Sequence, residues 1–172
     1  MDEILFENKI LTVTKRTATL NGNTVARTVI DMPDAVMVIA VDKQQNVHFL
    51  EEYMAPREAF LATFVKGAVA EDATPAQAAA RELAEELALK AEETTPLMCV
   101  DDRPSHLTTR THIFLATGCT PLDTPQNGDE EQGTLRHKTL PLATLKAQRN
   151  TLFTCARCRA ALAELALSGS DL

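Results

Sequence analysis

Alternating apolar and polar residues characterise the first part of the chain. Residues 4–20 alternate in the way expected of a half-exposed β-strand. The triplet at 21–23, Asn-Gly-Asn, is a strong hairpin turn signal, and residues 24–30 then form the predicted return strand. We therefore expect a small antiparallel β-hairpin unit at residues 1–31 and a main domain at residues 32–172.

Two runs in the main domain predict successive strands. Residues 35–41, AVMVIAV, are continuously apolar, as is typical of a strand buried on both faces. Residues 47–53 follow a polar turn and predict the next strand. Further strands are expected at 97–100 and 112–117. Strands on both sides of a central helix predict an α/β sandwich with a mixed sheet.

The central helix is the clearest element in the sequence. Thr74 can cap free backbone N–H groups, and Pro75 is tolerated at the first helical position. From there to Leu89 the residues are almost all strong helix formers. One apolar stripe recurs at helical spacing and can pack on the sheet. It consists of Ala76, Ala79, Ala80, Leu83 and Leu87.

A second helix is expected at the end of the chain. Thr151 is the predicted cap, and the helix should continue to Leu167. Apolar residues recur at helical spacing along it, which indicates packing against the core. They are Phe153, Ala156, Ala160, Ala163 and Leu167.

Three carboxylates gather along one edge of the central helix. Glu82, Glu85 and Glu86 stand at i, i+3 and i+4, which places them on one arc beside the apolar stripe. Such like charges repel by roughly 0.2–0.5 kcal/mol per pair, so the arrangement favours a compensating cation. Mg²⁺ is a natural candidate, because a few carboxylates, water and substrate phosphates complete its shell. Arg81, one turn before Glu85, can orient a neighbouring acid. The alternative is a solvated charged face on a surface helix.

The residues around these acids resemble the Nudix motif. Gly67 occupies its first position, residues 81–86, RELAEE, match its centre, and Leu89 matches its final aliphatic position. Two positions depart from the motif: Ala73 stands where the family has a glutamate, and Ala88 stands where it has a glycine. The Lys-Gly pair that opens the box is similar to that of the branch acting on ADP-ribose and other ADP compounds.

This resemblance implies a Nudix-type α/β/α sandwich and a reaction. The expected activity is Mg²⁺-dependent hydrolysis, with Mn²⁺ as a possible substitute, of the pyrophosphate bond in a nucleoside diphosphate linked to another group. ADP-ribose or a related ADP compound is the expected substrate, and the N-terminal unit is expected to build a homodimer. The implied metal ligands are the carbonyl of Gly67 with Glu82, Glu85 and Glu86. The implied catalytic residues are Arg81, Glu85 and, from a polar loop, Glu130 or Glu131.

The same resemblance suggests residues that contact the substrate. Lys66, just before Gly67, can meet a phosphate, and Arg57 lies in a loop that approaches the nucleotide in related hydrolases. Arg103 and Ser105 belong to a loop with the Pro-Ser pair of the ADP-compound branch. For Arg57 the alternative is an ordinary solvated side chain.

The departures leave a second function open. The family glutamate supports the arginine and the metal site, and Ala73 cannot do so. Glu71 or Asp72 would replace it only through a slipped loop, and residues 59–66 contain no acid. The competing hypothesis is therefore a Nudix-fold module that binds nucleotide but hydrolyses it weakly. A scaffold protein is a third class.

Composition excludes several other classes of protein. The 172 residues suffice for one domain with a substantial core, and the 45% hydrophobic content is that of a globular protein. A net charge of −7 argues against nucleic acid as the main partner. The acidic start, MDEILFENK, lacks the apolar segment of a signal peptide, and no run is long enough to span a membrane. We expect a cytoplasmic protein.

The four cysteines suggest no disulfide framework. Cys155 and Cys158 form a lone Cys-x-x-Cys, whereas a structural zinc site needs a second such pair or two suitably spaced histidines. Both lie in an apolar helical pattern, which indicates small buried side chains. Metal binding or redox chemistry is the alternative.

Overall fold

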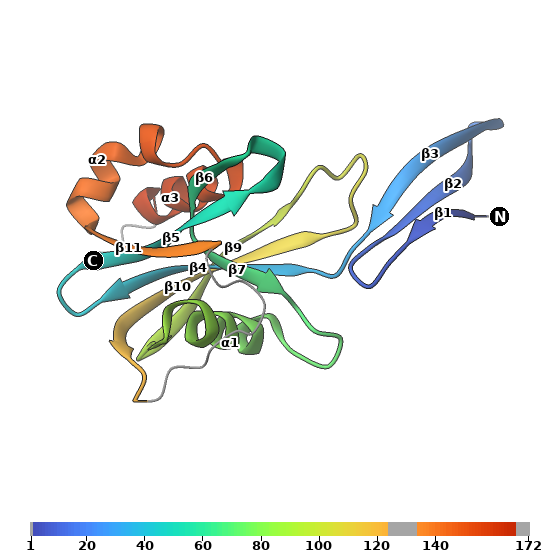
Figure 1. Ribbon diagram of the computed structural model, residues 1–172. Coiled ribbons are helices and arrows are strands. Elements are labelled where there is room, and N and C mark those ends of the chain that lie inside the picture. Colours follow the sequence, from blue (N-terminus) through green and yellow to red (C-terminus); the bar gives the residue numbers. More distant parts are fainter. Residues whose placement is uncertain (1, 124–133, 168–172) are drawn as a thin grey trace.

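The computed structural model describes residues 2–123 and 134–167, and two sheets organise them. A three-stranded antiparallel sheet comprises β1 (Glu3–Glu7), β2 (Thr12–Leu20) and β3 (Asn23–Asp31). Figure 1 shows this N-terminal sheet extending away from the rest of the molecule. The expected hairpin is thus β2 and β3, with β1 as an additional strand. The sequence alternation hid a turn at Asn8, whose side chain accepts hydrogen bonds from the backbone of Ile10 and Leu11.

The main sheet is mixed, as the sequence predicts. Its central path is β11-β5-β4-β10-β8, while β6 pairs with β5, β7 with β4 and β9 with β10. Strands β4 and β10 run parallel, and the other pairings are antiparallel. The strand bounds are β4 (Ala35–Asp42), β5 (Asn46–Met54), β6 (Ala59–Thr63), β7 (Val65–Ala68), β8 (Leu89–Lys90), β9 (Glu93–Asp101), β10 (Arg110–Pro121) and β11 (Leu135–Pro141).

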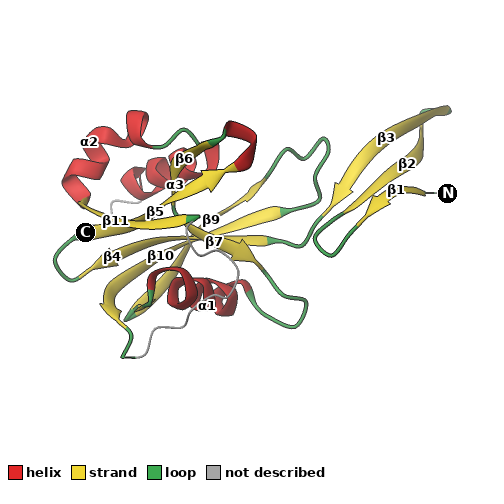
Figure 2. Cartoon of the chain, viewed as in Figure 1, coloured by secondary structure: helices red, strands yellow, loops and turns green. Residues whose placement is uncertain are grey.

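Helices cover both faces of this sheet (Figure 2). On one face lies α1 (Pro75–Leu87), and on the other lie α2 (Leu142–Leu152) and α3 (Ala156–Leu167). A short 3-10 helix, η1 (Ala55–Arg57), connects β5 to β6. Among the described residues, no helix is both long and apolar enough to cross a membrane.

Strand β4 divides the hydrophobic core into two clusters. Alternate side chains of a strand point to opposite faces of its sheet. Val36, Val38 and Ala40 accordingly pack with the apolar side of α1. Met37 and Ile39 pack with residues of α2 and α3. The continuous apolar run in the sequence is therefore a strand with helices on both faces.

Helix α1 begins and ends where its backbone groups find partners. Thr74 and Gln77 form a capping box: the backbone N–H of Gln77 bonds to the Thr74 side chain, and the Gln77 side chain accepts the N–H of Thr74. The helix ends at Leu87, because Ala88 takes the left-handed conformation with φ of 53°. The predicted end at Leu89 was two residues too far.

The C-terminal part contains two helices, so the prediction of one helix capped by Thr151 is wrong. Thr151 lies in the last turn of α2, and its hydroxyl donates to the carbonyl of Gln148. The break follows at Phe153, which is fully buried and stacks on Phe64 at 4.6 Å between ring centroids. Burying this ring requires the chain to turn inward, and α3 starts afresh three residues later.

Candidate active site

Arg81 connects α1 to the neighbouring strand. Its Nη2 atom lies 2.6 Å from Glu82 Oε1, and its Nη1 donates to Glu85 Oε2 at 3.3 Å. The same Nη2 also donates to the backbone carbonyl of Ala68 on β7 at 3.0 Å. The guanidinium therefore holds two carboxylates and fixes the helix against β7.

Gly67 leaves room for a carboxylate. Glu82 is 8% exposed and lies so close to Gly67 that a Cβ atom built there would be 2.0 Å from Glu82 Cδ. Gly67 is held in β7 by pairing with Val36 of the central strand. The missing side chain at this position thus allows an acid of α1 to approach the backbone of the sheet.

Glu86 is a partly buried acid beside other acids. It accepts a hydrogen bond from the backbone N–H of Lys66 at 3.2 Å. Burial raises its pKa to about 8, and the charges of Glu82 and Glu52 act in the same direction, while Lys66 opposes them. Such a carboxyl is more readily ionised when a cation is near.

Glu52 belongs to this group, although the sequence analysis did not select it. It lies on β5, and its carboxylate forms an ion pair with the ammonium of Lys66. Residues 59–66 contain no acid, so Glu52 brings a carboxylate to this side from an earlier strand. The available signal was a pair of acids, Glu51 and Glu52, near the end of a strand with buried residues at its centre.

These groups are chemically suited to a hard divalent cation. Carboxylates and a backbone carbonyl are the oxygen donors that Mg²⁺ and Mn²⁺ prefer. Gly67 provides the open backbone, and Glu82, Glu85 and Glu86 provide carboxylates on one helix. As they stand, no three His, Cys, Asp or Glu side chains among residues 2–123 and 134–167 are gathered closely enough to hold an ion. Arg81 instead pairs with two of the acids.

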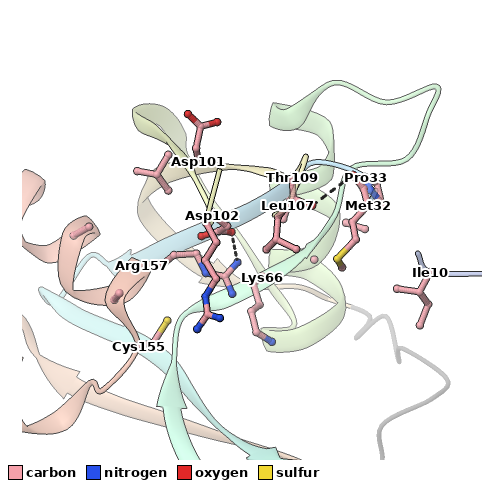
Figure 3. A pocket seen from close by; sticks show the side chains of 17 residues that line it. Ile10, Met32, Pro33, Lys66, Asp101, Asp102, Leu107, Thr109, Cys155 and Arg157 are labelled. Carbon is pink, nitrogen blue, oxygen red and sulfur yellow. Dashed lines mark hydrogen bonds and ion pairs between the residues drawn. The ribbon is translucent and has the colours of Figure 1, made fainter. Parts of the chain in front are cut away.

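A cavity of about 720 Å³ lies next to this cluster. Lys66, Gly67 and Arg103, which the sequence analysis selected, all line it. Cys155 and Arg157, at the start of α3, also line it and lie near Lys66 in Figure 3. Lys66 and Gly67 therefore lie between the acids of α1 on one side and the cavity on the other.

The other predicted residues lie elsewhere. Arg57 is exposed in η1, and Ser105 is exposed in the turn before β10; neither is among the residues that line the cavity. Glu71 and Asp72 are exposed in the turn before α1. The loop acids Glu130 and Glu131 lie outside the described residues.

Comparison with known families identifies this arrangement. A family model described as NUDIX domain matches residues 31–154, which is most of the chain. The chain belongs to the Nudix family. The matched region of the Nudix domain begins at the last residue of β3 and includes the helix with Arg81 and its acids.

Two proteins of similar sequence have different functional names. A methanol dehydrogenase activator from Bacillus methanolicus is 27% identical over 112 residues, which are 65% of this chain and 60% of the activator. An ADP-ribose pyrophosphatase from Bacillus subtilis (strain 168) is 25% identical over 131 residues, which are 76% of this chain and 71% of that enzyme. The chain therefore spans less than two thirds of the length of the activator.

A solved structure matches nearly the whole chain. The crystal structure of an ADP compounds hydrolase has a TM-score of 0.82 and 25% sequence identity. The match covers 98% of this chain and 91% of that protein, so it includes the N-terminal sheet as well as the Nudix domain. The predicted Nudix-type α/β sandwich is confirmed.

Proposed function

We propose that this protein hydrolyses the pyrophosphate bond of a nucleoside diphosphate linked to another group, with ADP-ribose or a related ADP compound as substrate. The observation that carries the proposal is the position of Lys66 and Gly67. They line the large cavity on one side, and contact Glu86, Glu52 and Glu82 on the other. A substrate in the cavity would therefore have its phosphates beside the acid cluster.

The cofactor in this proposal is Mg²⁺, which Mn²⁺ could replace. The carbonyl of Gly67 and the carboxylates of Glu82, Glu85 and Glu86 would hold it. When bound, such an ion polarises a phosphoryl oxygen and lowers the pKa of an attacking water. Arg81 contacts both Glu82 and Glu85. These two carboxylates are therefore already held close together before any ion binds.

Lys66 supplies positive charge at the boundary between cavity and acids. Its ammonium pairs with Glu52, and its backbone N–H bonds to Glu86. In the proposed complex the ammonium meets a phosphate oxygen and stabilises charge that develops on the leaving group. Glu130 or Glu131 would assist as a ligand or general base.

The second candidate is a module that binds nucleotide but hydrolyses it weakly. It is favoured by Ala73, which offers no carboxylate to Arg81. The Ala68 carbonyl accepts a hydrogen bond from Arg81 instead, and a neutral oxygen interacts less strongly with a guanidinium than a carboxylate does. The two candidates differ in turnover and agree on ligand binding.

One assay separates the two candidates. AMP release is measured on a panel of ADP-ribose and other nucleoside diphosphate compounds, with Mg²⁺ and with Mn²⁺. The enzyme proposal expects turnover that Glu85→Gln lowers by about 10²-fold or more, while Glu93→Gln, at an exposed position on β9, leaves it unchanged. Ligand-induced thermal stabilisation without turnover supports the binding module and overturns the enzyme.

The proposal also includes a homodimer, which the exposed apolar side chains of the N-terminal sheet support. Ile4, Leu5 and Phe6 of β1 are each at least half exposed, and Ile10 and Leu20 are also exposed. A three-stranded sheet is stable when it packs against an apolar partner, and this one projects from the main domain (Figure 1). A second copy of the chain would cover these side chains.

A further inference from the structure

Cys155 and Cys158 stand at the start of α3 in an arrangement that the proposed hydrolysis does not use. Cys155 directly precedes the helix, and its carbonyl accepts the backbone N–H of Arg159 at 3.1 Å. The sequence analysis expected both thiols to be small buried side chains. That holds for Cys158, which is fully buried, but Cys155 is half-buried and lines the cavity.

The start of α3 favours negative charge on the Cys155 sulfur. Cys155 directly precedes the helix, and Cys158 follows three residues later in its first turn. Hydrogen bonding from the Cys158 side chain and from the backbone N–H groups of Cys158 and Arg157, together with the nearby Arg157 guanidinium, lowers the pKa of Cys155 to about 5 despite its partial burial. Donors at a helix start favour a thiolate, which is the nucleophilic form of cysteine.

Arg157 is held in place beside this sulfur. Its Nη1 atom donates to Asp102 Oδ2 at 3.1 Å and to Thr111 Oγ1 at 3.2 Å. Figure 3 shows Arg157, Asp102 and Cys155 around the same opening. The positive charge near Cys155 is thus fixed by residues of β9, β10 and their connection, and does not depend on a free surface side chain.

Cys158 is placed to complete a reaction that Cys155 begins. It stands three residues after Cys155, in the first turn of α3, and its sulfur lies 3.9 Å from Thr63 Oγ1. Because it is fully buried, a reagent that enters the cavity meets Cys155 first. One thiol is therefore exposed to attack a reagent, and its neighbour is protected but adjacent.

We propose that Cys155 and Cys158 are a redox-active dithiol that exchanges with small disulfides entering the cavity. The Cys155 thiolate attacks one sulfur of the disulfide, forms a mixed disulfide and releases the other half as a thiolate. Cys158 then loses its proton, attacks the Cys155 sulfur and expels the second half, which leaves with that proton as a thiol. The protein loses two electrons and forms a Cys155–Cys158 disulfide, while the small disulfide is reduced to two thiols.

This site shares a cavity with the proposed hydrolytic centre but is chemically separate from it. A group attached to Cys155 would occupy space that Lys66 and Gly67 also line. The exchange itself needs neither a metal nor a nucleotide. Its test therefore reads out thiols alone, and its failure can be distinguished from failure of the hydrolysis.

The experiment treats the folded full-length protein with oxidised glutathione, blocks the remaining thiols with iodoacetamide, and maps them by mass spectrometry after trypsin. Cleavage after Arg157 separates the two cysteines, so their disulfide appears as peptide 150–157 joined to peptide 158–159. Cys99 is exposed on β9 and serves as the internal reference thiol. We expect the joined peptide, and reaction at Cys155 about tenfold or more faster than at Cys99.

Two variants identify the order of the steps. Cys158→Ser should stop at a mixed disulfide between Cys155 and glutathione, and Cys155→Ser should leave Cys158 unreacted. Thermal unfolding confirms that each variant is folded. The proposal is overturned if Cys155 reacts no faster than Cys99, or if the joined peptide forms as readily in guanidinium-unfolded protein as in the folded chain.

Discussion

Gly67 and Glu82 lie so close together that the Glu82 carboxylate occupies the space where a Cβ atom of residue 67 would lie. A Cβ atom at residue 67 would lie 2.0 Å from both Cδ and Oε1 of Glu82. These atoms are at the far end of a side chain that can rotate. An added methyl group would therefore move the carboxylate and leave the strand in place.

The first prediction concerns this contact. Gly67→Ala should fold normally but lose about 10²-fold in turnover, because a shift of about 1 Å in a positioned group costs that much. AMP release and thermal unfolding measure the two effects. If Gly67 acts through Glu82, Gly67→Ala should add little to Glu82→Gln in the double variant. Independent, additive losses would contradict this explanation.

The second prediction concerns the end of α1. Ala88 has φ of 53°, a conformation that costs an L-residue with a side chain roughly 1–2 kcal/mol. Ala88→Gly should therefore raise the free energy of unfolding by about 1 kcal/mol in urea denaturation. As the matched control, Ala84→Gly in the last full turn of the helix should lower it by about 1 kcal/mol. Destabilisation by both changes would refute the prediction.

The third prediction concerns Asp34, which ties the starts of the two parallel strands together. It accepts hydrogen bonds from the backbone N–H of Arg110 at 3.0 Å and from His112 Nε2 at 2.9 Å. Burial alone would raise the pKa of Asp34, but these bonds and the positive charge of Arg110 outweigh it and lower the pKa below its ordinary value of 3.8. Asp34→Asn should reduce the free energy of unfolding at pH 7 by about 1–2 kcal/mol.

The difference in the free energy of unfolding between the unaltered protein and Asp34→Asn should become smaller as the pH falls. Since the folded-state pKa is lowered, the stabilisation is complete above the unfolded value of 3.8 and is lost as pH falls through the folded value. Urea denaturation curves of Asp34→Asn and the unaltered protein should therefore converge in acid. A gap that widens below pH 3.8 would show that another group is responsible.

The fourth prediction concerns the N-terminal sheet. Phe6→Ser removes an apolar side chain that is 54% exposed in the single chain, and the molar mass by light scattering should fall to half. Leu167→Ser is the control, because that leucine is 81% exposed at the end of α3 and should leave the mass unchanged. A monomeric unaltered protein would rule out the dimer.

The sequence predicted elements whose signals are local. Helix α1 has its capping residues and strong helix formers within one short segment, and β4 has its buried run. Of the apolar stripe expected on α1, Ala79, Leu83 and Leu87 are buried, whereas Ala76 and Ala80 are exposed and Ala78 is buried in their place.

The single long C-terminal helix was wrong, and so was its expected packing face. Ala156, Ala163 and Leu167 are exposed, while α3 buries Cys158, Ala161, Leu162 and Leu165. The burial of the Phe153 ring against Phe64, a distant residue in the sequence, interrupts the helix.

The part of the candidate site that lies on a single helix could be predicted from the sequence. Arg81 and the three acids lie on α1, so helical spacing alone placed them together. Glu52 was missed because it lies on β5 and Lys66 on β7, and the two strands are brought near each other by their separate pairings with β4. No spacing rule along the chain describes this. The same holds for Cys155, whose position on the cavity depends on how α3 packs over β9.

The alternating partners of β4 also bear on how this protein can diverge. Substitutions at Met37 or Ile39 are felt beneath α2 and α3, and those at Val36 or Val38 beneath α1. A change under α3, where Cys155 lines the cavity, is therefore separated by the sheet from the helix that carries Glu82, Glu85 and Glu86. One strand thus divides the packing of the molecule into two semi-independent halves.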